Sequence, residues 1–379
     1  MKYNNSESAK LQAAKKGLEK AAINYAIQIL TEYGNLALAE DELDDEPDDF
    51  DPNDEEHGHK RRKENTFMLA DAYDVLGQAR KADRVRDCNT ILKFDHTGGE
   101  HKLVYRNGCK VRLCPTCMWS LSRKNAYLIS RYMNIIKRNH EKTGFALLTL
   151  TQGRVKPEDL KDEVSRVLKA WTSMTKKRYF NREVHGYCRS LEITHDVQPK
   201  ITSEMYAWRK QYYIKQGLNI GDDNPFYDTY HTHLHIMLHM DNRRIIRLRT
   251  TEYRLMEVND WRRLWGDALK LNYVPVVDIR EFKPEKGHGT YELAKYIVKP
   301  DDYIFANDEK MAETVGVLDN ATYERTLLAY AGTFREARNQ FADDDEILDD
   351  TLPLKDESVN ITTWCWNTGY SQYNRVYDI

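Results

Sequence analysis

Short runs typical of β-strands alternate with longer runs typical of helices along the middle of the chain. Four short runs have the composition of β-strands: Phe145–Thr151, Cys188–Thr194, Thr232–Met240 and Val274–Phe282. Five longer runs have apolar residues at helical spacing: Met118–Arg138, Pro157–Thr175, Thr202–Lys215, Thr250–Leu271 and Thr290–Val298. Strands that alternate with helices in this way predict a sheet covered by helices, in either the α+β or the α/β class.

The two flanks of this region have different patterns. Residues Ser6–Tyr33 carry apolar positions at near-helical spacing and predict an amphipathic helix. Further helices are predicted at Thr66–Ala82 and Ala321–Ala342. The stretch between the first two helices has many acidic and few apolar residues, so it predicts a disordered linker.

These patterns divide the chain into five parts. They are an N-terminal helix (residues 1–38), an acidic disordered linker (39–64), a helical and cysteine-rich region (65–140), a core of strands and helices (141–300) and a C-terminal helical and acidic extension (301–379). A chain of 379 residues is long enough to bury at least one substantial core.

The formal net charge of −3 hides an uneven distribution. Twelve Asp and Glu residues and no Lys or Arg lie between Glu40 and Glu56, and removing these twelve charges leaves +9 on the rest. A basic body suits a protein that binds a polyanion such as nucleic acid. The acidic stretch is equally consistent with a solvated linker, so charge alone does not decide the function.

The sequence also indicates a compartment. No run of about 18 apolar residues is present, so no membrane span is predicted. The first residues lack the apolar core of a signal peptide, which makes the cytoplasm the expected location. In the cytoplasm we expect the six cysteines to be free or bound to metal rather than paired in disulfides.

Histidines alternate with apolar residues in the run TYHTHLHIMLHM, which begins at Thr229. On a strand, His231, His233 and His235 project to one face, at Cα spacings of about 6–7 Å, so that two of them can bind one divalent ion. The third ligand is expected from a neighbouring strand, with Glu192 as the first candidate and His195 as the second. Imidazoles and a carboxylate with open positions suit Mn²⁺ or Mg²⁺ better than a closed zinc site. The alternative is a polar face of an edge strand.

A tyrosine and a glutamate form a second candidate element. Glu292 and Tyr296 are four residues apart and share one face of the predicted helix. Lys295 and Lys299 flank the tyrosine, where they favour the phenolate and attract a phosphate. A tyrosine of this kind can act as a covalent nucleophile, although in an amphipathic helix the ring more often packs in the core.

Four cysteines predict a structural zinc site. They are Cys88, Cys109, Cys114 and Cys117, of which the last two form a Cys-Pro-Thr-Cys knuckle. Four thiolates leave no open position on the metal, so the expected role is structural. The predicted site supports DNA contact by nearby basic residues, which are Arg106, Lys110, Arg112, Arg123 and Lys124. The alternative is a set of buried free thiols.

Together these motifs resemble a known family. His233-Leu234-His235, followed downstream by YELAKYIVK, resembles the HUH (histidine–hydrophobic–histidine) endonucleases, and more narrowly the rolling-circle plasmid replication initiators (Rep) of Gram-positive bacteria. Similar pieces are FALLTLT at Phe145, CRSLEITHD at Cys188 and CKVRLCPTCMWSLSRK at Cys109. The resemblance implies an α+β fold with a central antiparallel sheet of the ferredoxin or RRM type, in which residues 141–300 form the nuclease core.

The resemblance also implies a reaction. A divalent ion held by His233 and His235 would polarise a phosphate of single-stranded or hairpin origin DNA. Tyr296 would attack that phosphate and leave a 5′-phosphotyrosyl link and a 3′-OH that primes synthesis, with a host helicase and DNA polymerase as partners. Glu292 occupies the position of a glutamate that activates water at termination, so that strand transfer or hydrolysis ends the cycle.

Some features depart from the family pattern and leave alternatives open. A long insertion separates Glu192 from the histidines, and its aromatic and basic residues suit either stacking on unpaired bases or a packed helical excursion. His231 is additional to the central pair, so the third metal ligand is not fixed. A non-catalytic zinc-containing DNA-binding regulator, a relaxase and a single-tyrosine transposase are the competing functions. The sequence does not decide whether the protein is a homo-oligomer, nor the origin sequence.

Overall fold

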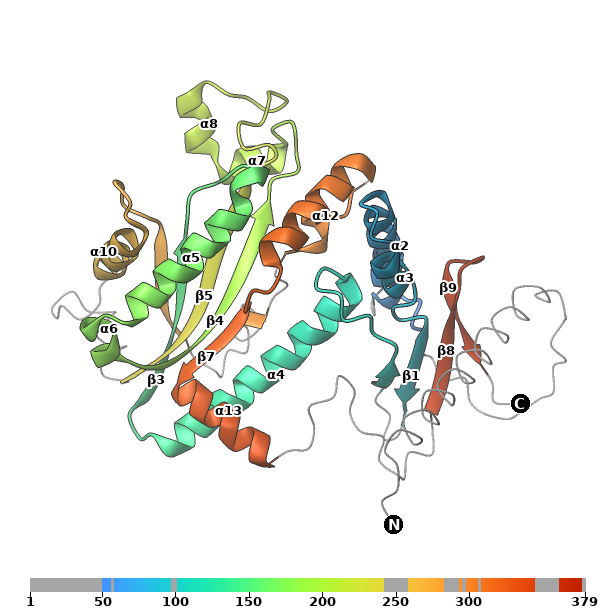
Figure 1. Ribbon diagram of the computed structural model, residues 1–379, viewed down its shortest axis with the longest axis horizontal. Helices are drawn as coiled ribbons and strands as arrows, with labels where there is room; N and C mark the ends of the chain where they lie inside the picture. Colours follow the sequence, from blue (N-terminus) through green and yellow to red (C-terminus); the bar gives the residue numbers. More distant parts are fainter. Residues whose placement is uncertain are drawn as a thin grey trace, which may run out of the picture.

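The computed structural model describes residues 50–55, 58–96, 101–241, 258–282, 293–294, 298–305, 308–344 and 361–376. Within them, two antiparallel sheets are joined and flanked by helices (Figure 1). This arrangement confirms the α+β class. The predicted helix at Ser6–Tyr33 and half of the acidic linker lie outside the described residues.

The larger sheet contains the four strands predicted from the hydrophobic pattern. Its strands are β3 (Thr143–Thr151), β4 (Val184–His195), β5 (Tyr230–Asp241), β6 (Val277–Phe282) and β7 (Leu328–Gly332). Their order is β6-β3-β5-β4-β7, and every neighbouring pair is antiparallel. The central strand β5 is the one that carries the alternating histidines.

The fifth strand, β7, replaces part of a predicted helix. The run Ala321–Ala342 was expected to be one helix, but α12 (Asp308–Thr322) ends at its start and α13 (Thr333–Asp344) follows β7. Glu324 has a φ of 53°, a left-handed conformation that cannot continue a right-handed helix. The prediction of a single helix here is therefore wrong.

The smaller sheet joins segments that are far apart in the chain. Its strands are β1 (Ile91–Asp95), β2 (Lys102–Arg106), β8 (Ile361–Asn367) and β9 (Gln372–Val376), in the order β2-β1-β8-β9. Its core includes Phe94, Trp366 and Tyr373, so the hairpin of β8 and β9 contributes two buried aromatic rings. None of these strands was predicted. The five-part division of the chain stays a prediction, although β7 and β8 pair with strands from before residue 300.

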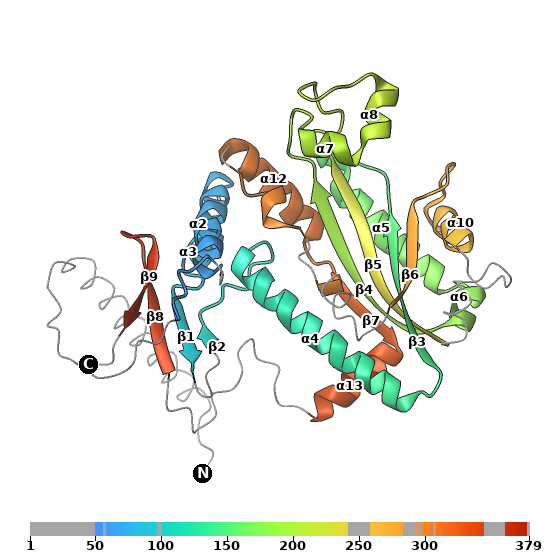
Figure 2. The ribbon, with the colours of Figure 1, turned by 180° about the vertical axis from the view of Figure 1, so that it is seen from behind.

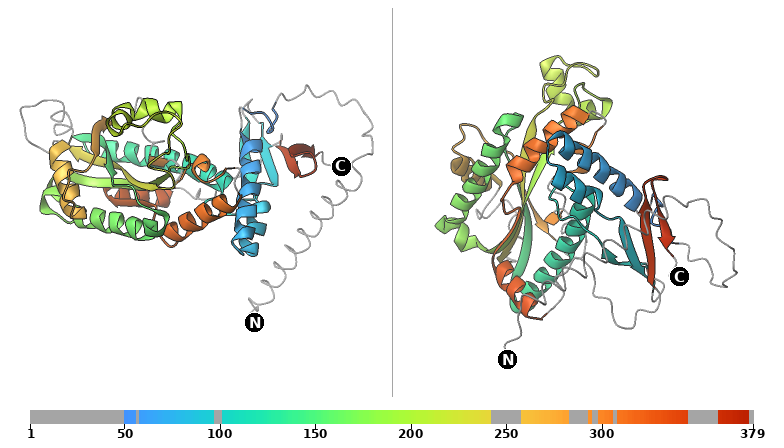
Figure 3. Two further views of the ribbon diagram at one scale, coloured as in Figure 1. Left: turned by 90° about the horizontal axis from the view of Figure 1, so that it is seen from above. Right: turned by 45° about the vertical axis from the view of Figure 1, so that its right-hand side comes forward.

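Helices cover both faces of the larger sheet (Figure 3). One face packs on α5 (Leu160–Thr175), preceded by the 3₁₀ turn η1 (Pro157–Asp159), and on α10 (Val258–Leu269). The other face packs on α4 (Pro115–Asn139) and α13. Pro115 sits in the first turn of α4 and Lys137 and Arg138 in its last turn, positions that favour a helix start and a helix end.

The remaining helices lie between the two sheets or at the two ends of the larger sheet. They are α2 (His59–Val75), α3 (Ala79–Arg86), α6 (Arg178–Glu183), α7 (Ser203–Trp208), α8 (Lys210–Gln216) and the 3₁₀ turn η3 (Pro300–Asp302). Helix α2 lies between the smaller sheet and α12 (Figure 2). It begins at His59, so residues 59–64 of the predicted linker are helical. Among the described helices, none is long and apolar enough to cross a membrane.

Candidate active site

The alternation of β5 places its histidines on the face covered by α4. Leu234 and Ile236 are fully buried on the opposite face, in the cluster that contains α5. His231, His233 and His235 share the α4 face, with ring centroids 4.2 Å apart for the first pair and 6.2 Å apart for the second. The imidazoles therefore form a row, as the period of two in the sequence predicts.

Glu192 on β4 lies beside this row. It pairs in register with His233, and its Oε2 is 2.6 Å from Nε2 of His235. Two imidazoles and one carboxylate from adjacent strands are thus brought together. The carboxylate contacts the ring of His235 directly. Among the described residues, the ligand atoms of these three side chains are not all close enough to one another to form a tight metal-binding cluster.

Two threonines of β3 orient the histidine rings. The hydroxyl of Thr149 lies 3.3 Å from Nδ1 of His235, and that of Thr151 lies 3.4 Å from Nδ1 of His233. A contact at Nδ1 leaves Nε2 of His233 as the nitrogen that can face a ligand, which is how metal-binding imidazoles are usually held, whereas Nε2 of His235 faces the carboxylate of Glu192. Sequence reasoning missed these threonines, because only the pairing of β3 with β5 reveals them.

Burial keeps two of the imidazoles neutral. It lowers the pKa of His231 to about 3 and that of His233 to about 4, the latter against the opposing effect of Glu192. Neutral imidazole is the form with a free lone pair for a metal ion. At neutral pH these rings are therefore in the state that binds a cation.

His195, the second candidate for the third ligand, has other partners. Its Nε2 lies 3.0 Å from Oδ1 of Asp228, and its Nδ1 lies 3.0 Å from the carbonyl oxygen of Asp302. The ring also stacks on Tyr230 with centroids 4.2 Å apart. Both nitrogens are engaged, and the odd number of residues from Glu192 puts this side chain on the other face of β4.

Tyr296, Glu292 and Lys295 lie outside the described residues. Their neighbour Leu293 is buried in the cluster that contains Met237 and α4, on the histidine face of the sheet. Further along, the hydroxyl of Tyr303 donates to the carbonyl of Leu113 at 2.6 Å. Among the described residues near the predicted nucleophile, Leu293 therefore lies on the same face of the sheet as the imidazoles.

The other predicted DNA-binding residues have mixed surroundings. Lys299 is exposed at the start of η3. Arg112 donates to the backbone carbonyls of Thr322 and Arg325, so part of its guanidinium has a structural role. Arg123 stacks over the ring of Trp119, with its Cζ 5.2 Å from the centroid.

The insertion between β4 and β5 is in part a packed excursion. Phe226 lies between the guanidinium groups of Arg154 and Arg209, at 4.8 and 4.7 Å from its ring centroid. Both arginines form ion pairs with Asp196 at 3.3 Å. Trp208 on α7 is 84% exposed and Tyr212 and Tyr227 are also exposed, so aromatic residues of the insertion remain accessible for stacking.

The four predicted cysteines form a compact buried cluster. Sγ of Cys88 lies 3.6 Å from that of Cys117 and 3.5 Å from that of Cys114, and Sγ of Cys109 lies 3.7 Å from that of Cys117. A tetrahedral zinc ion with Zn–S bonds of about 2.3 Å separates its sulfurs by about 3.8 Å. The cluster therefore has the spacing needed to hold a metal ion such as zinc.

Polar groups around the cluster suit negatively charged sulfur. Backbone amides of Cys109 and Lys110 point at Sγ of Cys88 and Cys117, at 3.4 and 3.3 Å. Lys110 has a φ of 56°, which turns the chain so that its amide reaches the sulfur. The buried ammonium of Lys63 donates to the carbonyl of Cys88 at 2.7 Å and lies near the thiols. The sequence pattern is thus matched by a site built for thiolates.

Comparisons with known proteins agree with the motifs. A family model described as "Replication protein" (Rep_1) matches residues 100–374. "Protein rep" of Streptococcus pneumoniae is 29% identical over 285 residues, 74% of this chain and 78% of the relative. "Protein rep" of Bacillus amyloliquefaciens is 26% identical over 349 residues, 83% of this chain and 92% of the relative. No solved structure matches the chain.

The matched region includes the cysteine knuckle, both strands of the histidine and glutamate pair, and the segment of the predicted nucleophile. It covers well over half of the 379 residues. The relatives come from Gram-positive bacteria, as the resemblance implies. The chain belongs to the Rep_1 family of replication proteins, the plasmid rolling-circle initiators.

Proposed function

We propose that this protein starts rolling-circle replication by nicking one strand of its plasmid origin and joining itself to the 5′ end. The observation that carries this proposal is the meeting of His233, His235 and Glu192 on the sheet face where Leu293 is also buried. Leu293 is three residues from Tyr296, so a metal site and a nucleophile on this face would be close enough to act on one phosphate.

The three ligand residues give this site its chemistry. His233 and His235 would supply neutral nitrogens and Glu192 a negative oxygen, a set that fits Mn²⁺ or Mg²⁺ with positions left for substrate. When bound there, the ion would polarise the scissile phosphate and offset its developing charge. His231 is the alternative third ligand, because its ring lies 4.2 Å from that of His233.

The proposed cleavage is a transesterification at phosphorus. The phenolic oxygen of Tyr296 forms a bond to phosphorus, the P–O3′ bond breaks, the phenol loses its proton and the departing 3′ oxygen gains one. Lys295 and Lys299 would attract the phosphate group. Glu292 would accept a proton from water or from a second 3′-OH at termination, so that hydrolysis or strand transfer releases the protein.

The cysteine cluster would hold a structural zinc ion. The expected partners are origin DNA in single-stranded or hairpin form, a host helicase and a DNA polymerase. The expected location is the bacterial cytoplasm. One observation favours a nicking enzyme over a non-catalytic DNA-binding regulator. The contact of Glu192 with His235 gives the histidine row a carboxylate that a purely structural strand does not need.

The test is a covalent-attachment assay. The protein is incubated with Mn²⁺ and supercoiled origin plasmid, and we expect open circles with protein bound at a DNA 5′ end. Tyr296→Phe removes one oxygen and should abolish both products while leaving origin binding in place. Glu292→Ala should still nick but terminate poorly. If Tyr296→Phe nicks as fast as the parent protein, the nucleophile is a different residue.

A further inference from the structure

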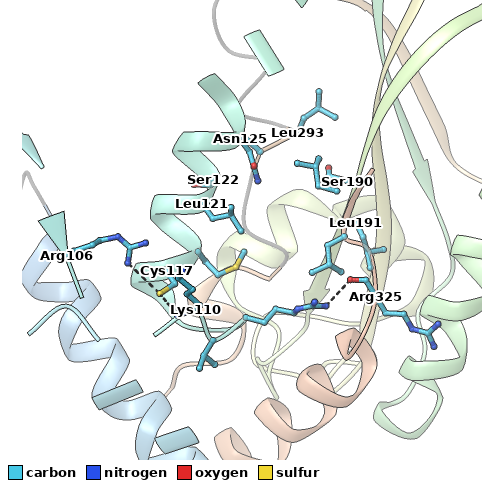
Figure 4. Close-up of a pocket in the computed structure, with 16 residues that line it drawn as sticks. Arg106, Lys110, Cys117, Leu121, Ser122, Asn125, Ser190, Leu191, Leu293 and Arg325 are labelled. Carbon is cyan, nitrogen blue, oxygen red and sulfur yellow. Dashed lines mark hydrogen bonds between the residues drawn. The ribbon is translucent and has the colours of Figure 1, made fainter. Parts of the chain in front are cut away.

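A pocket of about 440 Å³ lies beside the candidate active site, between α4, the loop of Lys110 and the start of β7 (Figure 4). Pockets that hold small organic ligands have volumes of about 300–1,000 Å³. The pocket is therefore large enough for one nucleotide and too small for a stacked stretch of duplex.

Two walls of this pocket belong to the catalytic face. Ser190 on β4 pairs in register with His235 on β5, so the two residues are direct neighbours across the strands. Leu293 and Ala294 form another part of the wall and precede Tyr296 by three and two residues. A ligand in the pocket would thus lie next to the phosphate that the proposed reaction cleaves.

The lining of the pocket combines positive charge with an apolar surface. Lys110 and Arg112 are among the cationic residues that line it, whereas the guanidinium of Arg325 donates to Ser165 and points away from the pocket (Figure 4). The described lining residues include no Asp or Glu. Leu121 contributes an apolar side chain that is 43% exposed, and Asn125, one turn further along α4, offers an amide (Figure 4). A nucleotide has the matching parts: an anionic phosphate, a flat apolar base and a hydrogen-bonding edge.

We propose that this pocket receives one unpaired nucleotide of the origin strand next to the nick site, a proposal that rests on the proposed function. The base packs against Leu121 and presents its edge to Asn125, while the adjoining phosphate faces Lys110 and Arg112. A base can enter only when it has left its duplex, so the pocket selects extruded single-stranded DNA. The cysteine loop, which carries Lys110, then has a part in substrate recognition beyond its structural role.

The experiment measures the binding of single-stranded origin oligonucleotides by fluorescence anisotropy, without added divalent ion. Each oligonucleotide has an abasic site at one position near the nick. We expect one position at which the missing base weakens binding by the parent protein roughly five- to a hundredfold, the range for loss of one stacked base. In Leu121→Trp, whose indole fills the pocket, the abasic site at that position should have almost no further effect.

Two more variants keep the result interpretable. Val75→Trp adds the same ring at a site that is 62% exposed at the end of α2, and should retain the parent's abasic profile. Asn125→Leu should still need a base at the sensitive position but discriminate less between the four bases. Thermal unfolding of each variant reports whether it folds, and Asn125→Leu still tests the pocket if Leu121→Trp does not.

An abasic profile that is the same in the parent and Leu121→Trp would overturn the pocket assignment, as would an equal loss of affinity at every position. This result is separate from failure of the proposed function. If the parent protein attaches to the DNA 5′ end with Mn²⁺ but binds equally well wherever the abasic site is placed, the nicking function stands and the nucleotide pocket does not. A parent protein that never nicks refutes the function itself.

Discussion

At the scale of single residues, Glu192 connects the two strands of the candidate site, because it pairs with His233 and contacts His235. Glu192→Gln keeps its shape and removes the charge that attracts a cation. Loss of a residue that merely supports a metal ligand costs about 10–100-fold in affinity, so we expect Mn²⁺ binding to weaken at least tenfold and nicking to fall with it. Isothermal titration of zinc-loaded protein measures the affinity.

The control for this variant is Glu158→Gln, which changes an exposed carboxylate in η1. It should bind Mn²⁺ like the parent protein. Unchanged Mn²⁺ affinity in Glu192→Gln would remove Glu192 from the ligand set and favour His231 in its place.

A second residue, His239, makes the stability of the folded protein depend on pH because its side chain is buried. Burial lowers its pKa to about 3, and its Nδ1 lies 2.9 Å from the hydroxyl of Thr333. In the unfolded chain its pKa is about 6.5, so the unfolded state binds the extra proton as the pH falls below 6.5 and the folded state loses stability until its own pKa is reached. We expect His239→Asn to be less stable than the parent at pH 7, with a gap that narrows by about 1–2 kcal/mol at pH 5. Urea unfolding at both pH values checks this, and an equal gap would contradict it.

At the scale of elements, the edge strand β7 depends on one glycine. Gly332 has a φ of 54°, and a methyl group there would overlap the carbonyl oxygen of His185 on β4. Gly332→Ala should therefore destabilise the protein by about 3 kcal/mol or more, because strain in the left-handed region adds to a backbone clash. Gly217→Ala is the matched control, since Gly217 also has a positive φ but open space around it. Urea unfolding that gives equal losses for both variants would exclude the clash.

The sequence predicts elements well where one face is buried. Strands β3, β4, β5 and β6 were predicted from the β-prone composition of short runs. In β5 the apolar residues also alternate, and the same period predicts the row of His231, His233 and His235. Strand β7 has the sequence LAYAG, in which small residues hide the period, and β8 depends on pairing with a distant strand. Thr149 and Thr151 could be placed beside the histidines only through the register between strands.

At the scale of the whole molecule, the cysteine cluster joins the smaller sheet to α4. Cys88 precedes β1, Cys109 follows β2, and Cys114 and Cys117 lie at the start of α4, which covers the histidine face. Loss of a structural zinc ion here should lower the melting temperature by roughly 10 °C or more, since such ions contribute a large share of folding free energy.

Metal analysis and thermal unfolding of Cys117→Ser test this prediction. Cys365→Ser changes a cysteine of β8 outside the cluster and should keep the parent's zinc content. A purified parent protein that contains no zinc, and whose melting does not respond to a chelator, would show that the four thiols are merely buried.

The pairing of β1 with β8 has a consequence for how the protein folds during its synthesis. Asp95 and Ile361 are partners although more than 260 residues separate them in the chain. A ribosome therefore completes the strands of the larger sheet before it makes the segment that covers β1, and until then β1 offers an open edge to other chains. Proteolytic clipping after α13 would expose the same edge, so the clipped protein would tend to aggregate rather than persist as a folded fragment.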